Sequence, residues 1–261
     1  MSETATPLLE LKGVSKSFGA VQALYEVDFH VAPGQVMALV GDNGAGKSTL
    51  IKCIAGIYPV DSGEVRFGGE PVKIHGPKDA AALGIEVVYQ DLALADNLDV
   101  VQNMYLGREA TSGPLRALDE VAMEKRAKET LSGLSVTTIR SVRQTVAGLS
   151  GGQRQSVAVA KAVMWNSKLV ILDEPTAALG VAQTRQVLDL VRRLGEQGLA
   201  VVLVSHNLHD IFEVADDITV LRLGQNVSEH RRVDVTQTQI VEAITAGKMS
   251  NVPGQGDGVV A

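Results

Sequence analysis

A glycine-rich loop carries a lysine and two hydroxyl side chains at a spacing that suits phosphate binding. It matches the pattern G-x-x-x-x-G-K-[ST], and its members are Gly41, Asp42, Asn43, Gly44, Ala45, Gly46, Lys47, Ser48 and Thr49. The glycines allow backbone N–H groups to turn inward around a phosphate chain, and a helix beginning near Gly46 would add its positive dipole end. Lys47 would bring charge to the β- and γ-phosphates, and Ser48 would offer its hydroxyl to Mg²⁺.

The alternative interpretation of this loop is a glycine-rich turn without a ligand. In a chain of this composition, a chance match is expected about once in a hundred. The context argues further against chance, because the apolar run Val36–Val40 precedes the loop and the helical pattern Lys47–Ala55 follows it. The sequence therefore predicts a nucleotide-phosphate site.

Two carboxylates follow a second apolar run. Residues 169–172 read Leu-Val-Ile-Leu and lead directly into Asp173 and Glu174. Ligands of open α/β sheets bind at the carboxyl ends of strands, so Asp173 is the expected partner of Mg²⁺. Glu174 is then placed to polarise a water for attack on the γ-phosphate. An ordinary solvated strand end is the alternative, and the phosphate loop elsewhere in the chain argues against it.

A third motif, Leu-Ser-Gly-Gly-Gln at residues 149–153, opens the helical run Gln153–Val163. Ser150 is a good N-cap, and Gly151 and Gly152 free the backbone to approach an anion. Taken alone, this motif is equally well explained as an ordinary helix start. With the two preceding motifs, it resembles the signature of the nucleotide-binding subunits of ATP-binding-cassette (ABC) transporters.

The resemblance extends over about residues 8–246 and implies roles for further residues. Phe18 matches an aromatic that stacks on adenine, although a core aromatic is the alternative. Gln90 matches a loop glutamine that senses Mg²⁺ and the attacking water. His206 matches a switch histidine on the γ-phosphate. At Gly180 the chain departs from the family, which usually has an aspartate that contacts the partner subunit.

The resemblance also implies a mechanism that needs two subunits. In this family, two subunits meet head to tail, and each ATP lies between the phosphate loop of one and the signature helix of the other. The expected cofactors are ATP and Mg²⁺. The nucleotide would contact the phosphate loop, Phe18 and the partner's signature motif of Ser150, Gly151, Gly152 and Gln153. Lys47, Gln90, Glu174 and His206 would serve hydrolysis, and the metal would bind Ser48, Gln90 and Asp173.

The elements that must position these residues alternate between strand and helix. Val36–Val40, Lys168–Leu172 and Ala200–Val204 are apolar runs of the kind found in strands buried on both faces. Helical patterns follow them, at Lys47–Ala55, Val181–Glu196 and Asn207–Ala215. This alternation predicts an α/β fold, a P-loop NTPase core with a parallel sheet.

Two further segments should extend this core. Strand-like stretches at Leu8–Phe18, Val21–Val31 and Gly63–Phe67 have no helices between them, which predicts an N-terminal antiparallel β subdomain. Residues from about 92 to 165 read as a helical subdomain that ends with the signature helix, and Asp119–Leu134 is its clearest amphipathic helix. We expect one nucleotide-binding domain over residues 1–246 and a flexible tail over 247–261.

Composition excludes several other classes of protein. The 261 residues carry a net charge of −6, which argues against a nucleic-acid partner. No apolar run approaches the 18–20 or so residues of a membrane-spanning helix, and the first residues lack a signal-peptide pattern. Together with these observations, the resemblance to ABC transporter subunits implies a subunit at the cytoplasmic face of the inner membrane. Its expected partners are transmembrane permease subunits, a second copy or a related ATPase subunit, and indirectly a periplasmic solute-binding protein.

The finer resemblance is to importers of monosaccharides of the ribose, xylose or fructose type. It rests on residues 91–98 and 103–109, the segment after Gln90, and on the residues that follow the signature motif and Glu174. An importer of another small solute, such as branched-chain amino acids, remains an alternative. A soluble ABC ATPase of DNA repair or translation is a more distant one. Many ATPases of sugar importers carry two cassettes in one chain, and this sequence shows one, so it would pair with itself or with a related subunit.

Overall fold

The computed structural model describes residues 6–113 and 117–247, and its largest sheet has six strands. Their order is β12-β11-β3-β10-β9-β6. Neighbours from β11 to β6 pair in parallel, whereas β12 is antiparallel to β11. The bounds are β3 (Val36–Val40), β6 (Ile85–Val88), β9 (Leu169–Asp173), β10 (Ala200–Val204), β11 (Asp217–Arg222) and β12 (Gln225–Arg231). The predicted parallel core is confirmed.

A second, antiparallel sheet forms from the N-terminal strands, as the sequence predicts. Its strand order is β2-β1-β4-β5, and β1 pairs antiparallel with both β2 and β4. The bounds are β1 (Leu9–Phe18), β2 (Val21–Val31), β4 (Ser62–Phe67) and β5 (Glu70–Pro71). The hairpin turn between β1 and β2 brings Phe18 opposite Val21.

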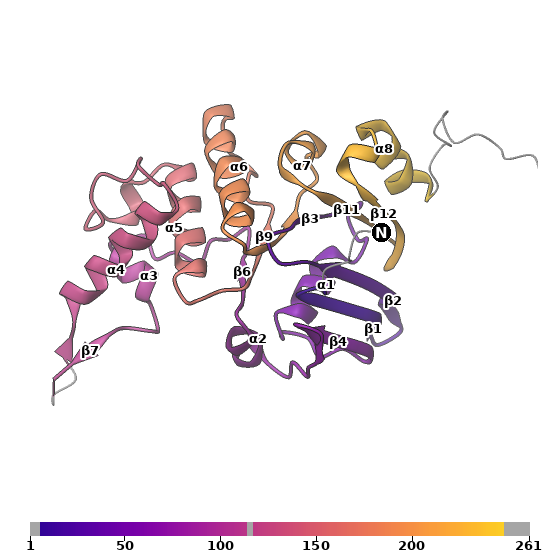
Figure 1. Cartoon of the computed structure of the whole chain (residues 1–261), viewed down its shortest axis with the longest axis horizontal. Helices are drawn as coiled ribbons and strands as arrows, with labels where there is room; N and C mark the ends of the chain where they lie inside the picture. The colour runs from indigo at the N-terminus through magenta and orange to yellow at the C-terminus, as the bar shows by residue number, and fades with distance from the viewer. Residues whose placement is uncertain (1–5, 114–116, 248–261) are drawn as a thin grey trace, which may run out of the picture.

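Five strands of the central sheet, β3, β6, β9, β10 and β11, divide their side chains between two hydrophobic cores. In β3, Val36, Ala38 and Val40 pack into the core on the helical side, whereas Met37 and Leu39 pack into the core shared with the antiparallel sheet. This alternation is the period of two that strand geometry imposes. The second core also encloses the apolar face of α1 (Lys47–Ile54), including Cys53. Figure 1 shows α1 between the antiparallel sheet and the central strands.

Helices from the second half of the chain cover the opposite face of the central sheet. They are α5 (Gly151–Val163), α6 (Val181–Glu196), α7 (Leu208–Val214) and α8 (Gln237–Ala246). Figure 1 shows α3 (Val100–Tyr105), α4 (Glu120–Gly133) and α5 grouped at one end of the molecule, away from the antiparallel sheet. A small hairpin of β7 (Thr111–Ser112) and β8 (Ala117–Leu118) joins α3 to α4.

Some elements have no counterpart in the sequence-based prediction. The strands β11 and β12, and the helices α2 (Pro77–Leu83) and α8, belong to this group, as does the short 3₁₀ turn Arg232–Asp234. The predicted tail lies outside the described residues except for Gly247, which ends α8 in a left-handed conformation. Among the described helices, none has the length and apolar character required to cross a bilayer.

Candidate functional site

The phosphate loop closes around its own lysine. Lys47 Nζ donates to the carbonyl oxygens of Gly41 and Asp42, at 2.7 and 3.0 Å. Gly46 is the N-cap of α1, has a φ of 104° and offers no side-chain cap. The first N–H groups of a helix have no partner within the helix, so those of α1 remain available to an anion. The loop thus combines a cation with a helix start that is left open by its glycine.

Position 46 requires glycine for two reasons: its positive φ, and the close approach of residues 23 and 24 in β2. A Cβ at this position would lie 2.9 Å from the Ala23 carbonyl oxygen and 2.9 Å from Leu24 Cδ2. Such distances are too short for a real side chain, so the strand β2 can pass over the loop only if residue 46 lacks one. Ala23 therefore lies directly against the start of the phosphate-binding helix.

A cavity of about 440 Å³ opens at the loop. Its lining is formed by Asn43–Thr49 together with Val21, Gln22, Ala23, Leu223 and Gly224. The last five come from the β1–β2 hairpin and the β11–β12 turn, and the sequence prediction missed them. Their residue types carry no chemical signal, and only tertiary packing brings them to the loop.

The carboxyl ends of β9 and β10 bring the acidic pair and the histidine together. The two strands pair in parallel with Asp173 opposite Val204, and Glu174 N donates to Val204 O at 2.8 Å. Two residues after Val204, His206 Nδ1 lies 2.8 Å from Glu174 Oε2. The Glu174 side chain is 17% exposed and that of His206 is 76% exposed. Parallel strand pairing therefore explains how residues 32 positions apart in the sequence come into contact.

Glu174 has a φ of 52°, in the left-handed region that residues other than glycine seldom adopt. Such strain is concentrated at functional sites, where the surrounding structure holds it in place. Here the hydrogen bond from Glu174 N to Val204 O and the contact with His206 fix the residue on both sides. The backbone therefore turns the Glu174 carboxylate toward the histidine.

The charged groups of the site act on one another's pKa values. Burial lowers the pKa of Lys47, and the nearby charges of Glu174, Asp42 and Asp173 oppose this effect. Burial raises the pKa of Asp173, the Glu174 charge raises it further, and Lys47 and Lys52 oppose the rise. These mutual effects require proximity, so the phosphate-loop lysine and the acidic pair share one site.

Burial also raises the pKa of Tyr89, and the charge of Asp173 adds to this shift. Tyr89 therefore lies near Asp173, although the sequence prediction did not include it. The next residue, Gln90, is exposed, and among the described residues its side chain has no hydrogen-bond partner. The fold thus places Gln90 beside the edge of the site, just beyond the end of β6.

Phe18 is exposed beside the residues that line the cavity and does not belong to the core. Its side chain is 43% exposed, and its hairpin partner Val21 lines the cavity. The alternative of a core aromatic is therefore wrong for this residue. Its position allows the ring to contact a base whose phosphates lie in the loop.

The signature motif begins α5 with a capping box. Ser150 Oγ accepts from Gln153 N at 3.4 Å, and Gln153 Oε1 accepts from Ser150 N at 2.9 Å. A Cβ on Gly151 would lie 2.8 Å from Leu179 Cδ2, and one on Gly152 would lie 3.1 Å from the Cβ of Gln183. Both positions therefore require glycine because the segment after Glu174 packs closely against them, and this requirement does not depend on a ligand.

The signature motif and the phosphate loop lie apart within the chain. None of the residues that line the cavity at the loop belongs to the motif. Figure 1 shows α1 and α5 on opposite sides of the strands β6 and β9. Of the predicted site residues, the fold therefore brings together the loop and the acidic pair, with Phe18 on the hairpin that borders the loop, but not Ser150–Gln153.

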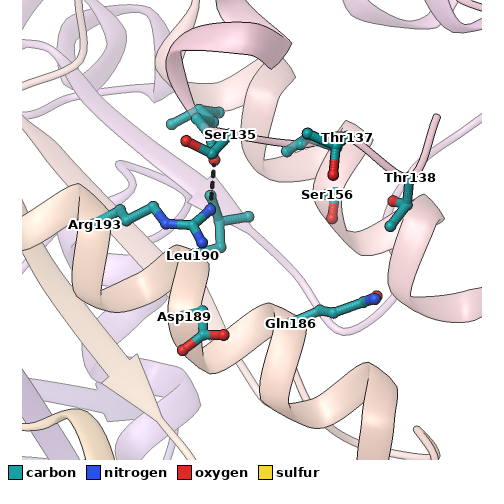
Figure 2. Close-up of a pocket in the computed structure, with 10 residues that line it drawn as sticks. Ser135, Thr137, Thr138, Ser156, Gln186, Asp189, Leu190 and Arg193 are labelled. Carbon is teal, nitrogen blue, oxygen red and sulfur yellow. Dashed lines mark hydrogen bonds between the residues drawn. The ribbon is translucent and has the colours of Figure 1, made fainter. Parts of the chain in front are cut away.

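A separate polar cleft of about 150 Å³ lies beside the signature helix (Figure 2). The segment from Leu134 to Thr138 forms one wall and α6 the other, and Arg193 Nη1 donates to Leu134 O at 3.0 Å across it. The Thr138 carbonyl in this wall accepts from Gln153 Nε2 at 2.7 Å. This hydrogen bond from the cleft wall therefore supports the start of the signature helix. The residues that line the cleft include none of the predicted nucleotide site.

Comparison with known proteins identifies the family. The family model described as ABC transporter matches residues 24–177, which is more than half of the chain. The chain belongs to the ABC transporter family. This membership confirms the resemblance of the motifs, the P-loop α/β fold and the expected ATPase activity.

Several ABC import proteins are similar over nearly the whole chain. The fructose import ATP-binding protein FrcA of Rhizobium meliloti is 46% identical, with 93% of this chain and 95% of that protein covered. The xylose/arabinose import ATP-binding protein XylG of Sulfolobus acidocaldarius is 44% identical, with 94% and 96% covered. The ribose import ATP-binding protein RbsA of Yersinia pestis is 39% identical, and the match covers 94% of this chain and 48% of that protein.

Solved ABC cassettes have the same fold. The ADP conformation of MJ1267, an ATP-binding cassette of an ABC transporter, gives a TM-score of 0.79 at 26% identity and covers 92% of this chain and 96% of that one. The dimeric, post-hydrolysis structure of the cassette MJ0796 bound to ADP and Pi gives 0.70 at 26% identity, with 86% and 98% covered.

Proposed function

We propose that this chain is the ATP-hydrolysing subunit of an importer of a monosaccharide. One observation supports the hydrolytic role above all: the charges of Asp173 and Glu174 both raise the pKa of the phosphate-loop Lys47, and Glu174 contacts His206. The names of the FrcA, XylG and RbsA proteins, all of them monosaccharide import proteins, support the class of solute.

The working unit of this proposal is a pair of cassettes arranged head to tail. Within one chain, the signature motif is remote from the cavity at the phosphate loop, so it would serve the nucleotide of the other cassette. The dimeric MJ0796 structure supports pairing of such cassettes. We assign residues 1–246 to the cassette, with residues 92–165 as its helical part.

The residues of this chain would divide the work by charge and position. Lys47 and the N–H groups at the start of α1 would bind the β- and γ-phosphates and neutralise their charge. Glu174 would hold the attacking water and accept its proton, because its carboxylate adjoins the loop. His206, held at 2.8 Å from Glu174, would orient that carboxylate and donate to the γ-phosphate. Phe18 would stack on adenine.

The proposed metal is Mg²⁺, held by Ser48, Gln90 and Asp173. A hydroxyl, an amide oxygen and a carboxylate are the hard oxygen ligands that Mg²⁺ prefers. Among the described residues, no three His, Cys, Asp or Glu side chains form a metal site by themselves, so phosphate and water would complete the coordination. When bound, the ion would neutralise charge that develops on the phosphates.

The proposed partners are transmembrane permease subunits, a second cassette and, indirectly, a periplasmic solute-binding protein. The chain would then act as a peripheral subunit at the cytoplasmic face of the membrane. Purification of the tagged chain from its own cells tests this proposal. Recovery with a multi-span permease supports it, and recovery with ribosomes or DNA contradicts it.

The hydrolytic role is tested by Glu174→Gln in the purified chain with ATP and Mg²⁺. We expect ATP to bind as in the wild type while turnover falls at least about a hundredfold, because a general base is lost. Glu129→Gln, at an exposed position of α4, is the matched control and should hydrolyse normally. Near-normal turnover by Glu174→Gln would remove Glu174 from this role.

A further inference from the structure

The exposed ring of Phe18 contacts two other side chains, Tyr58 and Lys16. Tyr58 packs against it edge to face, with ring centroids 4.9 Å apart and planes at 73°. Lys16 Nζ lies over the ring, 5.5 Å from its centroid. Because Phe18 remains 43% exposed, these contacts leave part of its surface free for a ligand.

Tyr58 is attached directly to the phosphate-binding helix. The N–H groups of Ile57 and Tyr58 both donate to the carbonyl oxygen of Lys52 in the last turn of α1, at 2.8 and 3.1 Å. The Lys52 ammonium also lies over the Tyr58 ring, 5.6 Å from its centroid. Since α1 begins at Lys47, the ring of Tyr58 is fixed relative to the phosphate loop.

Lys16 is fixed just as firmly. Its side chain is only 10% exposed, and its ammonium donates to Asp61 Oδ1 at 2.6 Å. Asp61 Oδ2 in turn accepts from Ser17 N at 2.7 Å, next to Phe18. Both hydrogen bonds lower the pKa of Asp61, so this carboxylate stays charged and keeps the Lys16 ammonium over the Phe18 ring. Two residues of the loop after α1 therefore hold Phe18: Tyr58 contacts its ring, and Asp61 fixes Lys16 over it.

We infer that Tyr58 is a positioning residue for the adenine base. Tyr58 holds the Phe18 ring at a fixed place relative to the phosphate loop, so that the base can stack on it. The inference rests on the proposed nucleotide site and adds to it a residue that does not itself touch the nucleotide. A preorganised ring loses little freedom when a base stacks on it, so Tyr58 raises ATP affinity through Phe18. Hydrophobic packing alone would not require this arrangement, because Phe18 is too exposed to belong to the core.

The test compares a nucleotide that has a base with a phosphate chain that has none. Binding of ATP and of inorganic tripolyphosphate is measured calorimetrically for the wild type, Tyr58→Leu, Phe18→Leu and the double variant. Tyr58→Phe is the conservative control, because the described residues give the Tyr58 hydroxyl no hydrogen bond. Edge-to-face pairs of this kind correspond to about two- to tenfold in an equilibrium constant.

We expect Tyr58→Leu to weaken ATP binding by up to about tenfold, to leave tripolyphosphate binding unchanged, and to have no effect in the Phe18→Leu background. Tyr58→Phe should bind ATP as the wild type does. Unchanged ATP affinity in Tyr58→Leu would overturn the inference, as would equal losses for ATP and tripolyphosphate. If Phe18→Leu itself leaves ATP affinity unchanged, the proposed stacking on Phe18 fails first, and the inference fails with it.

Discussion

Asp173, the proposed Mg²⁺ ligand, lies where its charge is costly for the stability of the free protein. Burial raises its pKa from the ordinary value of 3.8, and the adjacent Glu174 charge adds to the shift. Lys47 and Lys52 offset only part of it. We therefore predict that Asp173→Asn stabilises the nucleotide-free chain while it impairs Mg²⁺-dependent hydrolysis.

The sign of the pH dependence follows from the raised pKa. Below pH 3.8 the carboxyl is protonated in both the folded and the unfolded chain, so the substitution changes no titration. As the pH rises from 3.8 through the folded-state pKa, the unfolded wild type ionises first and the wild type loses stability. Asp173→Asn has no such loss. Its stability advantage over the wild type should therefore grow across this interval and then become constant.

The size of the effect is limited by solvent. One unit of pKa corresponds to about 1.4 kcal/mol, and screening at this partly exposed carboxylate reduces the effect to the order of 1 kcal/mol. In a domain of this size, that shifts the melting temperature by about 2–4 °C.

Urea unfolding of the wild type and Asp173→Asn between pH 4 and 7.5 measures the stability difference directly. Asp234→Asn, at an exposed position, is the matched control and should follow the wild type. A variant that is less stable than the wild type at pH 7, or a difference that does not change with pH, would refute the electrostatic argument.

Two further substitutions test how the chain positions this site. Thr176→Val removes the hydroxyl that donates to Asp210 at 2.7 Å, and it leaves the carboxylate of this 2%-exposed residue unpaired. The free energy of unfolding should therefore fall by about 1–3 kcal/mol, and turnover should fall with it. Thr176→Ser keeps the hydroxyl and should restore both. Gly46→Ala should cost about 2 kcal/mol or more and reduce ATP binding, because of its φ and its clash with Ala23. Gly180→Ala should be nearly neutral, since a Cβ there meets nothing within 4 Å, and equal effects at both glycines would contradict the steric argument.

Chemistry-bearing residues were the most predictable part of the site. A phosphate loop must follow a buried strand and begin a helix, and Val36–Val40 and Lys47–Ile54 have these roles in the structure. Asp173 ends a strand because the carboxylate follows a continuous apolar run. The predicted bounds of α6 agree with the structure at both ends, since its apolar period is regular over sixteen residues.

The parts that escaped prediction depend on tertiary contacts. The strand β11 (Asp217–Arg222) joins the parallel sheet beside β3, and its turn brings Leu223 and Gly224 to the phosphate loop, although neither residue has a functional pattern. The sequence prediction also missed Tyr58, because a single aromatic residue in a loop has no pattern that reveals its contact with Phe18. The glycines of the signature motif were interpreted as an approach to an anion, whereas the structure shows that they also admit Leu179 and Gln183.

The packing of the signature motif bears on the missing carboxylate at position 180. The segment that leaves β9 begins with Glu174, turns at Ala178 with a φ of 60°, and enters α6 beneath Gly151 and Gly152. Leu179 and Gln183 are therefore in contact with the signature helix whether or not residue 180 carries a charge. In a head-to-tail pair, the carboxylate that activates water in one cassette would thus be tied by packing to the helix start that serves the other cassette's nucleotide. In such a pair, we expect these close-packed contacts, and not a carboxylate at position 180, to couple the two sites.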